Sequence, residues 1–227
     1  MKVGFFGGSF DPPHRGHIAL AQLAVDRLGL DRLLIAPVGT QPLKQDEAAS
    51  SSYEDRSAMV RLAIADESRL EISLIDSPRP NGLPNYTYDT IRSLRRSLQA
   101  DDTLYCLMGA DSFLTIGKWH RSEDLLVSCN FVVGSRPGFD LQRVAAALPE
   151  SVSLAAEEST LPGCLVIGLR GENGTHSQLY LLPDLAEDVS ATEIRSELRT
   201  GAHAEVKPAV AEYIASHGLY RNSDEAG

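Results

Sequence analysis

The feature that most constrains this chain is a glycine-rich turn between a first strand and a first helix. A short apolar run, Lys2–Phe6, stops at Gly7 and Gly8, and a helical pattern covers Gly16–Leu28. Glycine tolerates positive φ angles and lets backbone approach a bulky ligand closely. The free amides at a helix start also attract phosphate groups. This order of elements is typical of a parallel sheet that binds ligands beyond the carboxyl ends of its strands.

The following residues continue the alternation of strands and helices. Helical periodicity returns after expected helix starts at Ser52 and Thr87. We therefore expect an α/β fold, a Rossmann-like parallel sheet with helices on both faces. Residues 1–222 are expected to form a single domain, with 223–227 as a flexible tail. Apolar runs between turn residues predict four further strands, at Arg32–Val38, Leu70–Ile75, Thr103–Met108 and Asn130–Val133.

The second half of the chain carries two additions to this pattern. Leu165–Leu169 and Gln178–Leu182 flank Asn173-Gly174, which favours a β-hairpin inserted near residues 160–183. Helical patterns within 190–217 predict a small helical C-terminal extension. The polar segment Gly39–Ser52 predicts a mobile loop.

The charge balance limits the partners of this chain. Lys and Arg number 21 against 31 Asp and Glu, giving a net charge of −10. Such a chain repels nucleic acid and anionic membranes at long range, so any phosphate ligand needs a local site. No apolar run reaches the roughly 18 residues of a membrane helix. Three cysteines without a paired motif suit a reducing cytoplasm.

Two histidines follow the glycine turn and point to phosphate chemistry. His14 and His17 are three residues apart, so both can project from one side of the first helical turn. Imidazoles fixed there can donate hydrogen bonds to the oxygens that gain charge during nucleotidyl transfer. A phosphate of a second substrate could then attack directly in line, without a covalent enzyme intermediate.

Other interpretations of this segment are weaker. Zinc would need a third ligand and usually histidines four residues apart, and neither is evident. The Walker-A pattern and the G-x-G-x-x-G fingerprint are also absent. A plain turn with two surface histidines would be the default for either feature alone, but not for both directly after a first strand.

The stretch GGSFDPPHRGH resembles the signature of the nucleotidyltransferases that carry an H-x-G-H motif. Within them it is most similar to the bacterial nicotinate-nucleotide adenylyltransferases. Further stretches that resemble this family lie at 37–44 (PVGTQPLK), 86–90 (YTYDT), 109–111 (GAD) with 118–120 (KWH), 189–195 (VSATEIR) and 213–220.

The resemblance implies an enzyme of NAD biosynthesis that binds ATP and nicotinate mononucleotide and uses Mg²⁺ with the ATP, without a metal site of its own. It would join the mononucleotide to the adenylyl group, giving deamido-NAD and pyrophosphate. The resemblance implies catalytic roles for His14, His17 and Arg195. The implied ATP-binding residues are Gly7, Gly8, Ser9, Phe10, His14, His17, Gly109, Asp111, Ser190, Thr192 and Arg195. The implied mononucleotide-binding residues are Lys44, Thr87, Trp119, His120 and Arg136.

Several of these residues have ordinary alternatives. Ser190 with Glu193 is also a plain capping box, although a capped helix still presents free amides. A lone tryptophan such as Trp119 is more often core than ligand platform. Lys44 and Arg136 could be solvated surface charges, and Asp111 could cap a strand end.

The identity of the acceptor also has alternatives. The family often has tyrosine at the position of His120, so selectivity for the acid is a hypothesis. Nicotinamide mononucleotide, another phosphorylated acceptor such as phosphopantetheine, or a non-catalytic nucleotide sensor are the rival interpretations. The stretch Gly138–Leu182 exceeds what compact members need, and the sequence leaves its role and a homo-oligomer open.

Overall fold

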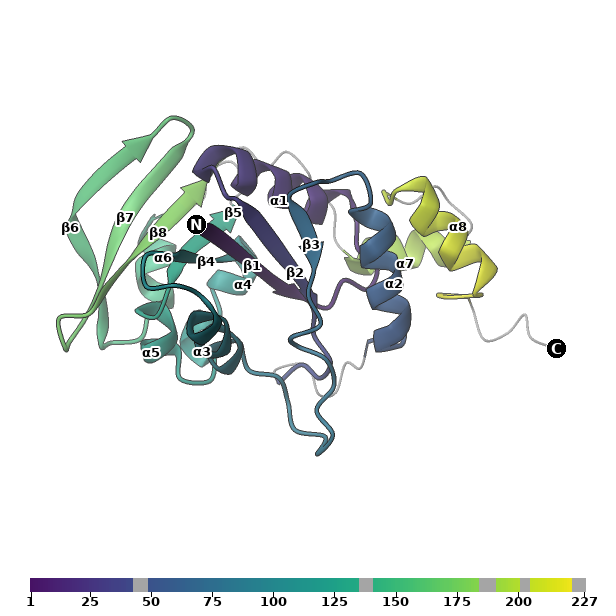
Figure 1. The fold of residues 1–227 in the computed structure, drawn as a ribbon, viewed down its shortest axis with the longest axis horizontal. Coiled ribbons are helices and arrows are strands. Elements are labelled where there is room, and N and C mark those ends of the chain that lie inside the picture. The colour runs from purple at the N-terminus through teal and green to yellow at the C-terminus, as the bar shows by residue number, and fades with distance from the viewer. Residues whose placement is uncertain (43–48, 135–140, 184–190, 201–204, 222–227) are drawn as a thin grey trace.

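A computed structural model describes residues 1–42, 49–134, 141–183, 191–200 and 205–221 (Figure 1). One eight-stranded sheet runs through the molecule in the order β3-β2-β1-β4-β5-β8-β7-β6. Five strands are parallel to one another, as predicted: β1 (Lys2–Gly8), β2 (Arg32–Pro37), β3 (Leu70–Ile72), β4 (Thr103–Gly109) and β5 (Asn130–Gly134).

The register brings the glycines of these strands to one edge. Gly8 pairs with Pro37, and Gly109 pairs with Gly134. Because β1 lies between β2 and β4, its carboxyl end is at the reversal of strand order. Ligands of open α/β sheets bind at such a reversal. The expected position of the glycine turn is therefore confirmed.

The far edge of the sheet differs from a purely parallel one. β7 (Cys164–Gly171) and β8 (His176–Leu182) form the predicted hairpin, and β8 pairs with β5 in parallel. β6 (Val152–Leu161) then adds an antiparallel strand at the outer edge, where Figure 1 shows it at the left. The central sheet is therefore parallel, as predicted, and only the pairings of β7 with β8 and of β6 with β7 are antiparallel. A hairpin makes its two strands antiparallel, and that geometry continues to the edge.

Two cores cover the two faces of the sheet, as expected. The first contains α1 (Arg15–Leu28), α2 (Tyr53–Ala63) and α8 (Pro208–Ser216). The second contains α3 (Thr87–Ser97), α4 (Ala110–Phe113), the 3₁₀ helix η1 (Ile116–Lys118), α5 (Ser122–Leu126) and α6 (Leu141–Ala147). The remaining helix, α7 (Ala191–Thr200), precedes α8 in the predicted C-terminal extension.

Local signals fix several helix ends. Gly29 ends α1 in the left-handed conformation, with φ of 61°, as glycine allows. Ser52 caps α2 by accepting a hydrogen bond from the backbone N–H of Asp55 at 3.0 Å. α3 begins at Thr87, so its N-cap residue is Tyr86. The prediction that Thr87 is the cap is therefore wrong by one residue. Among the residues described, no helix is both long and apolar enough to cross a membrane.

Candidate active site

The two histidines meet at the start of α1. Their ring centroids are 3.6 Å apart, and the rings are inclined by 31°. The backbone N–H of His14 donates a hydrogen bond to Nδ1 of His17 at 3.2 Å. Since Nδ1 of His17 accepts, the proton of a neutral ring is on Nε2. Nε2–H of His17 is therefore the group that can donate to a ligand.

Burial keeps both imidazoles neutral. It lowers the pKa of His14 to about 4 and holds the pKa of His17 well below its usual value, with His14 adding to the effect. Near neutral pH the pair therefore acts through N–H dipoles rather than through full positive charge.

Phe10 supports the second histidine. Its ring is nearly buried and lies 4.9 Å from the His17 ring and 5.3 Å from Phe6. A Cβ on Gly8 would lie 3.2 Å from the same ring, so a side chain there would force the Phe10 ring to shift. Phe10 therefore holds the His17 ring in place, and Gly8 leaves the space that the Phe10 ring occupies.

Asp11 ties the turn to distant parts of the chain. This residue is 3% exposed, and its carboxylate accepts from the Tyr220 hydroxyl at 2.6 Å and from the Ser50 N–H at 2.6 Å. The Ser51 hydroxyl donates to it as well. The backbone carbonyl of Asp11 accepts from Nη1 of Arg195 at 2.8 Å.

α7 therefore lies directly beside the turn. Nη2 of Arg195 also donates to the Thr192 hydroxyl at 3.2 Å, which joins two of the predicted ATP-binding residues. Both come from the segment that follows the long chain excursion through β6–β8, so only the tertiary fold brings Arg195 to the backbone of Asp11.

Arg56 is a site residue that the sequence analysis missed. It is 2% exposed, and its Nη1 donates to the backbone carbonyl of Ser9 at 2.7 Å. Gln41 donates to the Ser9 hydroxyl at 2.8 Å. A signal existed, because Arg56 shares the apolar face of α2 with Met59 and Ala63. A cation on an apolar helix face requires a buried partner.

Two of the predicted mononucleotide residues, Thr87 and His120, lie at or near the start of α3. The His120 ring contacts the Tyr86 ring with centroids 4.3 Å apart and planes inclined by 32°, which joins the segment after η1 to the residue that precedes Thr87. Trp119 is half-buried against the second core, and its indole N–H donates to the Thr115 hydroxyl at 3.2 Å. Trp119 is thus partly a core residue, as one interpretation held.

Gly109 and Asp111 lie at the carboxyl end of β4. A Cβ on Gly109 would meet nothing within 4 Å, so open space adjoins it. Asp111 is exposed on the first turn of α4. Lys44, Arg136 and Ser190 lie outside the described residues, as do residues 43–48 of the predicted mobile loop.

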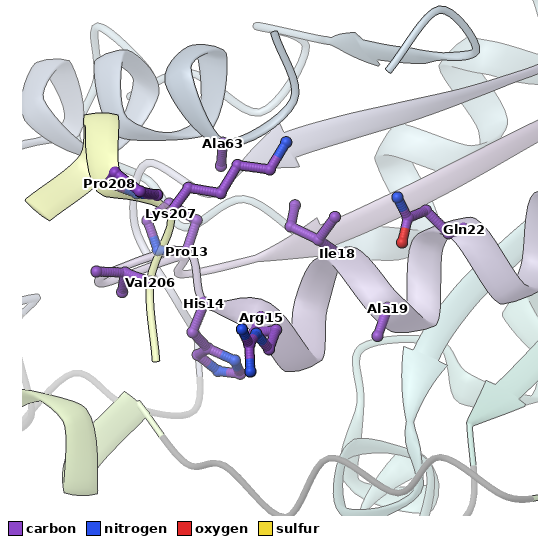
Figure 2. A pocket seen from close by; sticks show the side chains of 10 residues that line it. All are labelled: Pro13, His14, Arg15, Ile18, Ala19, Gln22, Ala63, Val206, Lys207 and Pro208. Carbon is purple, nitrogen blue, oxygen red and sulfur yellow. The ribbon is translucent and has the colours of Figure 1, made fainter. Parts of the chain in front are cut away.

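A hollow of about 420 Å³ adjoins the start of α1 (Figure 2). It is lined by α1, by Ala63 of α2 and by the segment Val206–Pro208. Among the predicted site residues within the described part of the chain, only His14 lines it. In Figure 2 the His14 ring and the Arg15 side chain point to the same side of the helix start.

The chain matches the cytidylyltransferase-like family over residues 5–197. A curated relative from Laribacter hongkongensis is 36% identical, covering 100% of this chain and 97% of its own. Another, from Pseudomonas aeruginosa strain PAO1, is 38% identical over 97% of both chains. Both carry the name "Probable nicotinate-nucleotide adenylyltransferase".

Solved structures share the fold. The Plasmodium falciparum nicotinic acid mononucleotide adenylyltransferase complexed with APC matches with a TM-score of 0.68 at 16% identity, covering 96% of both chains. The same enzyme complexed with NaAD gives 0.67 at 18% identity, covering 96% of this chain and 97% of that one.

Proposed function

This chain belongs to the cytidylyltransferase-like family as a nicotinate-nucleotide adenylyltransferase, and we propose how its residues carry out that reaction. The enzyme transfers the adenylyl group of ATP to nicotinate mononucleotide, giving deamido-NAD and pyrophosphate. The observation that carries the proposal for the site is the close contact between the His14 and His17 rings, in the turn after β1 at the reversal of strand order.

The chemical step is an in-line displacement at the α-phosphorus of ATP. An oxygen of the mononucleotide phosphate forms the new bond, and the bond from that phosphorus to the bridging oxygen breaks. Pyrophosphate leaves with the electron pair, so no covalent enzyme intermediate is required. Nε2–H of His17 donates to the oxygens that gain charge, and its backbone hydrogen bond fixes it before reaction.

Arg195 holds the turn in place for this step. Its guanidinium joins Thr192 of α7 to the carbonyl of Asp11, three residues before His14. The permanent cation also supplies local positive charge that a chain of net charge −10 needs to hold ATP. Arg56 supports the same turn from α2 through Ser9.

Enzymes of this kind generally use Mg²⁺ with ATP. The described residues contain no group of three or more His, Cys, Asp or Glu side chains that could hold a metal ion. Mg²⁺ in nucleotide sites is often held by one or two carboxylates together with substrate phosphates. The exposed Asp111 at the carboxyl edge fits a single carboxylate of this kind. When bound, the ion would neutralise charge on the departing pyrophosphate.

The nicotinate end of the acceptor binds at the start of α3 in this proposal. Trp119 would stack on the pyridine ring, and amides near Thr87 and His120 would donate to the carboxylate. Free backbone N–H groups at a helix start favour an anion, so they select the acid over the amide. The contact between the Tyr86 and His120 rings holds the two amide-bearing segments together.

Release of pyrophosphate from ATP tests the function. The full chain is incubated with ATP and nicotinate mononucleotide, nicotinamide mononucleotide or phosphopantetheine in turn. We expect release with the nicotinate compound and a kcat/KM at least tenfold lower with the amide. Equal values for acid and amide would contradict the proposed selectivity, and ATP binding without any release would indicate a nucleotide sensor.

We also propose the domain organisation, the cellular location and the partners of this enzyme. We propose one domain over residues 1–222, since β8 of the hairpin pairs directly with β5 of the parallel half. We propose a cytoplasmic enzyme, because Cys106, Cys129 and Cys164 are all unpaired. Nucleic acid is not proposed as a partner, given the net charge of −10. A homo-oligomer remains to be tested by sedimentation.

A further inference from the structure

A buried carboxyl group on the α3 side of β1 has no role in the mechanism above. Asp76 is 5% exposed, and its backbone carbonyl accepts from the N–H of Gly39 at 2.7 Å. The hydroxyl of Thr90, from the first turn of α3, donates to Oδ1. The first bond ties the backbone of Asp76 to the loop after β2, and the second holds its carboxyl group at the start of α3.

The second oxygen of Asp76 faces the end of β1. A Cβ built on Gly7 would lie 3.8 Å from Oδ2. Within the part of the chain that the structure describes, no residue donates a hydrogen bond to this oxygen. This oxygen is not among the fully enclosed side-chain atoms that lack a partner, so it keeps access to the surface and can accept a hydrogen bond from a ligand or a water.

The proposed function, on which this inference rests, narrows the identity of that donor. The phosphate and the carboxylate of nicotinate mononucleotide are anionic acceptors, which a carboxylate repels. The ribose hydroxyls are the hydrogen-bond donors that this substrate offers. A ribose hydroxyl is therefore the group of this substrate that can donate a hydrogen bond to Oδ2.

The position of Asp76 matches the middle of the substrate. Ribose joins the pyridine ring to the phosphate. The start of α3, proposed for the ring, contacts Asp76 through Thr90, and the end of β1, which leads to His17, adjoins it through Gly7. A ribose between those two sites would lie over Asp76.

We propose that Asp76 binds the mononucleotide by accepting a hydrogen bond from a ribose hydroxyl at Oδ2, with Thr90 holding the carboxyl group in orientation. Burial raises the pKa of Asp76 to about 6, and Arg79 opposes that rise. Above pH 7 the group is therefore a carboxylate, which accepts hydrogen bonds only.

The test compares nicotinate mononucleotide with its 2′-deoxy and 3′-deoxy forms on the full chain. Dissociation constants are measured by calorimetry at pH 8 for the wild type and Asp76→Ala. One deoxy form should bind the wild type roughly 10- to 100-fold more weakly than the natural compound, as a hydrogen bond to a charged group predicts. The same comparison on Asp76→Ala should differ by less than about threefold, because the acceptor is gone.

Controls separate this inference from the function and from misfolding. Asp26→Ala removes a carboxylate that pairs with Arg69 on the surface, and it should keep the wild-type penalty for the deoxy form. Turnover of the natural substrate by the wild type checks the function independently. If Asp76→Ala does not fold, a wild-type crystal soaked with mononucleotide decides, with a ribose hydroxyl expected within 3.2 Å of Oδ2. Equal binding of all three compounds by the wild type, or a penalty unchanged in Asp76→Ala, would overturn the proposal.

Discussion

At the scale of single residues, one backbone hydrogen bond determines what His17 can do. The N–H of His14 occupies Nδ1, which leaves Nε2–H directed away from the backbone as a donor. Replacing a single transition-state donor costs about 100- to 1,000-fold in kcat. We therefore expect His17→Ala to lower kcat by that factor, while ATP still binds.

A matched histidine elsewhere controls for this change. His176 is exposed at the start of β8, so His176→Ala should leave kcat within about twofold of the wild type. Steady-state rates of pyrophosphate release measure both variants, and thermal melts check folding. A folded His17→Ala enzyme with wild-type kcat would remove this imidazole from the mechanism.

The buried carboxyl group of Asp76 also makes the free energy of unfolding depend on pH. Its folded pKa of about 6 lies above the ordinary value of 3.8, so the folded protein binds more protons than the unfolded chain between these values. Stability contributed by this group therefore falls as pH rises from about 4 to 6, by about 3 kcal/mol. His14, with its lowered pKa of about 4, acts in the opposite sense over the same window.

The variant Asp76→Asn isolates the first contribution. An amide keeps an oxygen for the Thr90 hydroxyl and cannot ionise. The free energy of unfolding in urea should be similar for wild type and variant at pH 4. At pH 8 the variant should exceed the wild type by as much as about 3 kcal/mol. A difference that does not change with pH would show that the carboxyl does not titrate as described.

At the scale of elements, local sequence patterns predict single strands and helices but not the contacts between them. The strands of the parallel half are apolar runs between turn residues, and the start of α1 follows from its glycine turn. β6 escaped prediction because Glu157 and Glu158 interrupt its apolar alternation, and an edge strand tolerates charge. The bonds of Arg56 to Ser9 and of Asp76 to Thr90 join separate elements, so no single pattern contains them.

The connection of α7 to the turn before α1 depends on Arg195. Arg195→Ala releases the Asp11 carbonyl and Thr192, so the turn before α1 loses its connection to this helix. We expect kcat/KM for ATP to fall at least tenfold, whereas loss of such a bond costs only about 1 kcal/mol of stability. Arg195→Lys should recover little, because an ammonium lacks the planar fork that reaches both partners.

An arginine on the same helix is the control. Arg199 is exposed in the last turn of α7, and Arg199→Ala should change kcat/KM by less than about twofold. Unchanged kinetics in a folded Arg195→Ala enzyme would exclude α7 from ATP binding.

At the scale of the whole molecule, the site depends on both ends of the chain. Asp11 and Tyr220 are 209 positions apart, and their side chains meet at 2.6 Å in a buried bond. Burial and the neighbouring carboxylate both raise the pKa of the Tyr220 hydroxyl, so it remains a proton donor to Asp11. The turn that positions His14 is therefore bonded directly to the segment that follows α8.

Tyr220→Phe tests this dependence without altering the backbone. The variant keeps the buried ring and removes one donor from the Asp11 carboxylate, which should cost about 1–3 kcal/mol in the free energy of unfolding. The KM for ATP should rise as well, because Asp11 precedes His14 in the same turn. Tyr213→Phe is the matched change, since its hydroxyl bonds the half-buried Asp55 at 3.0 Å, and it should cost under about 1 kcal/mol with KM unchanged. If urea unfolding and ATP kinetics are the same for both variants, the C-terminal segment stabilises the fold without governing the site.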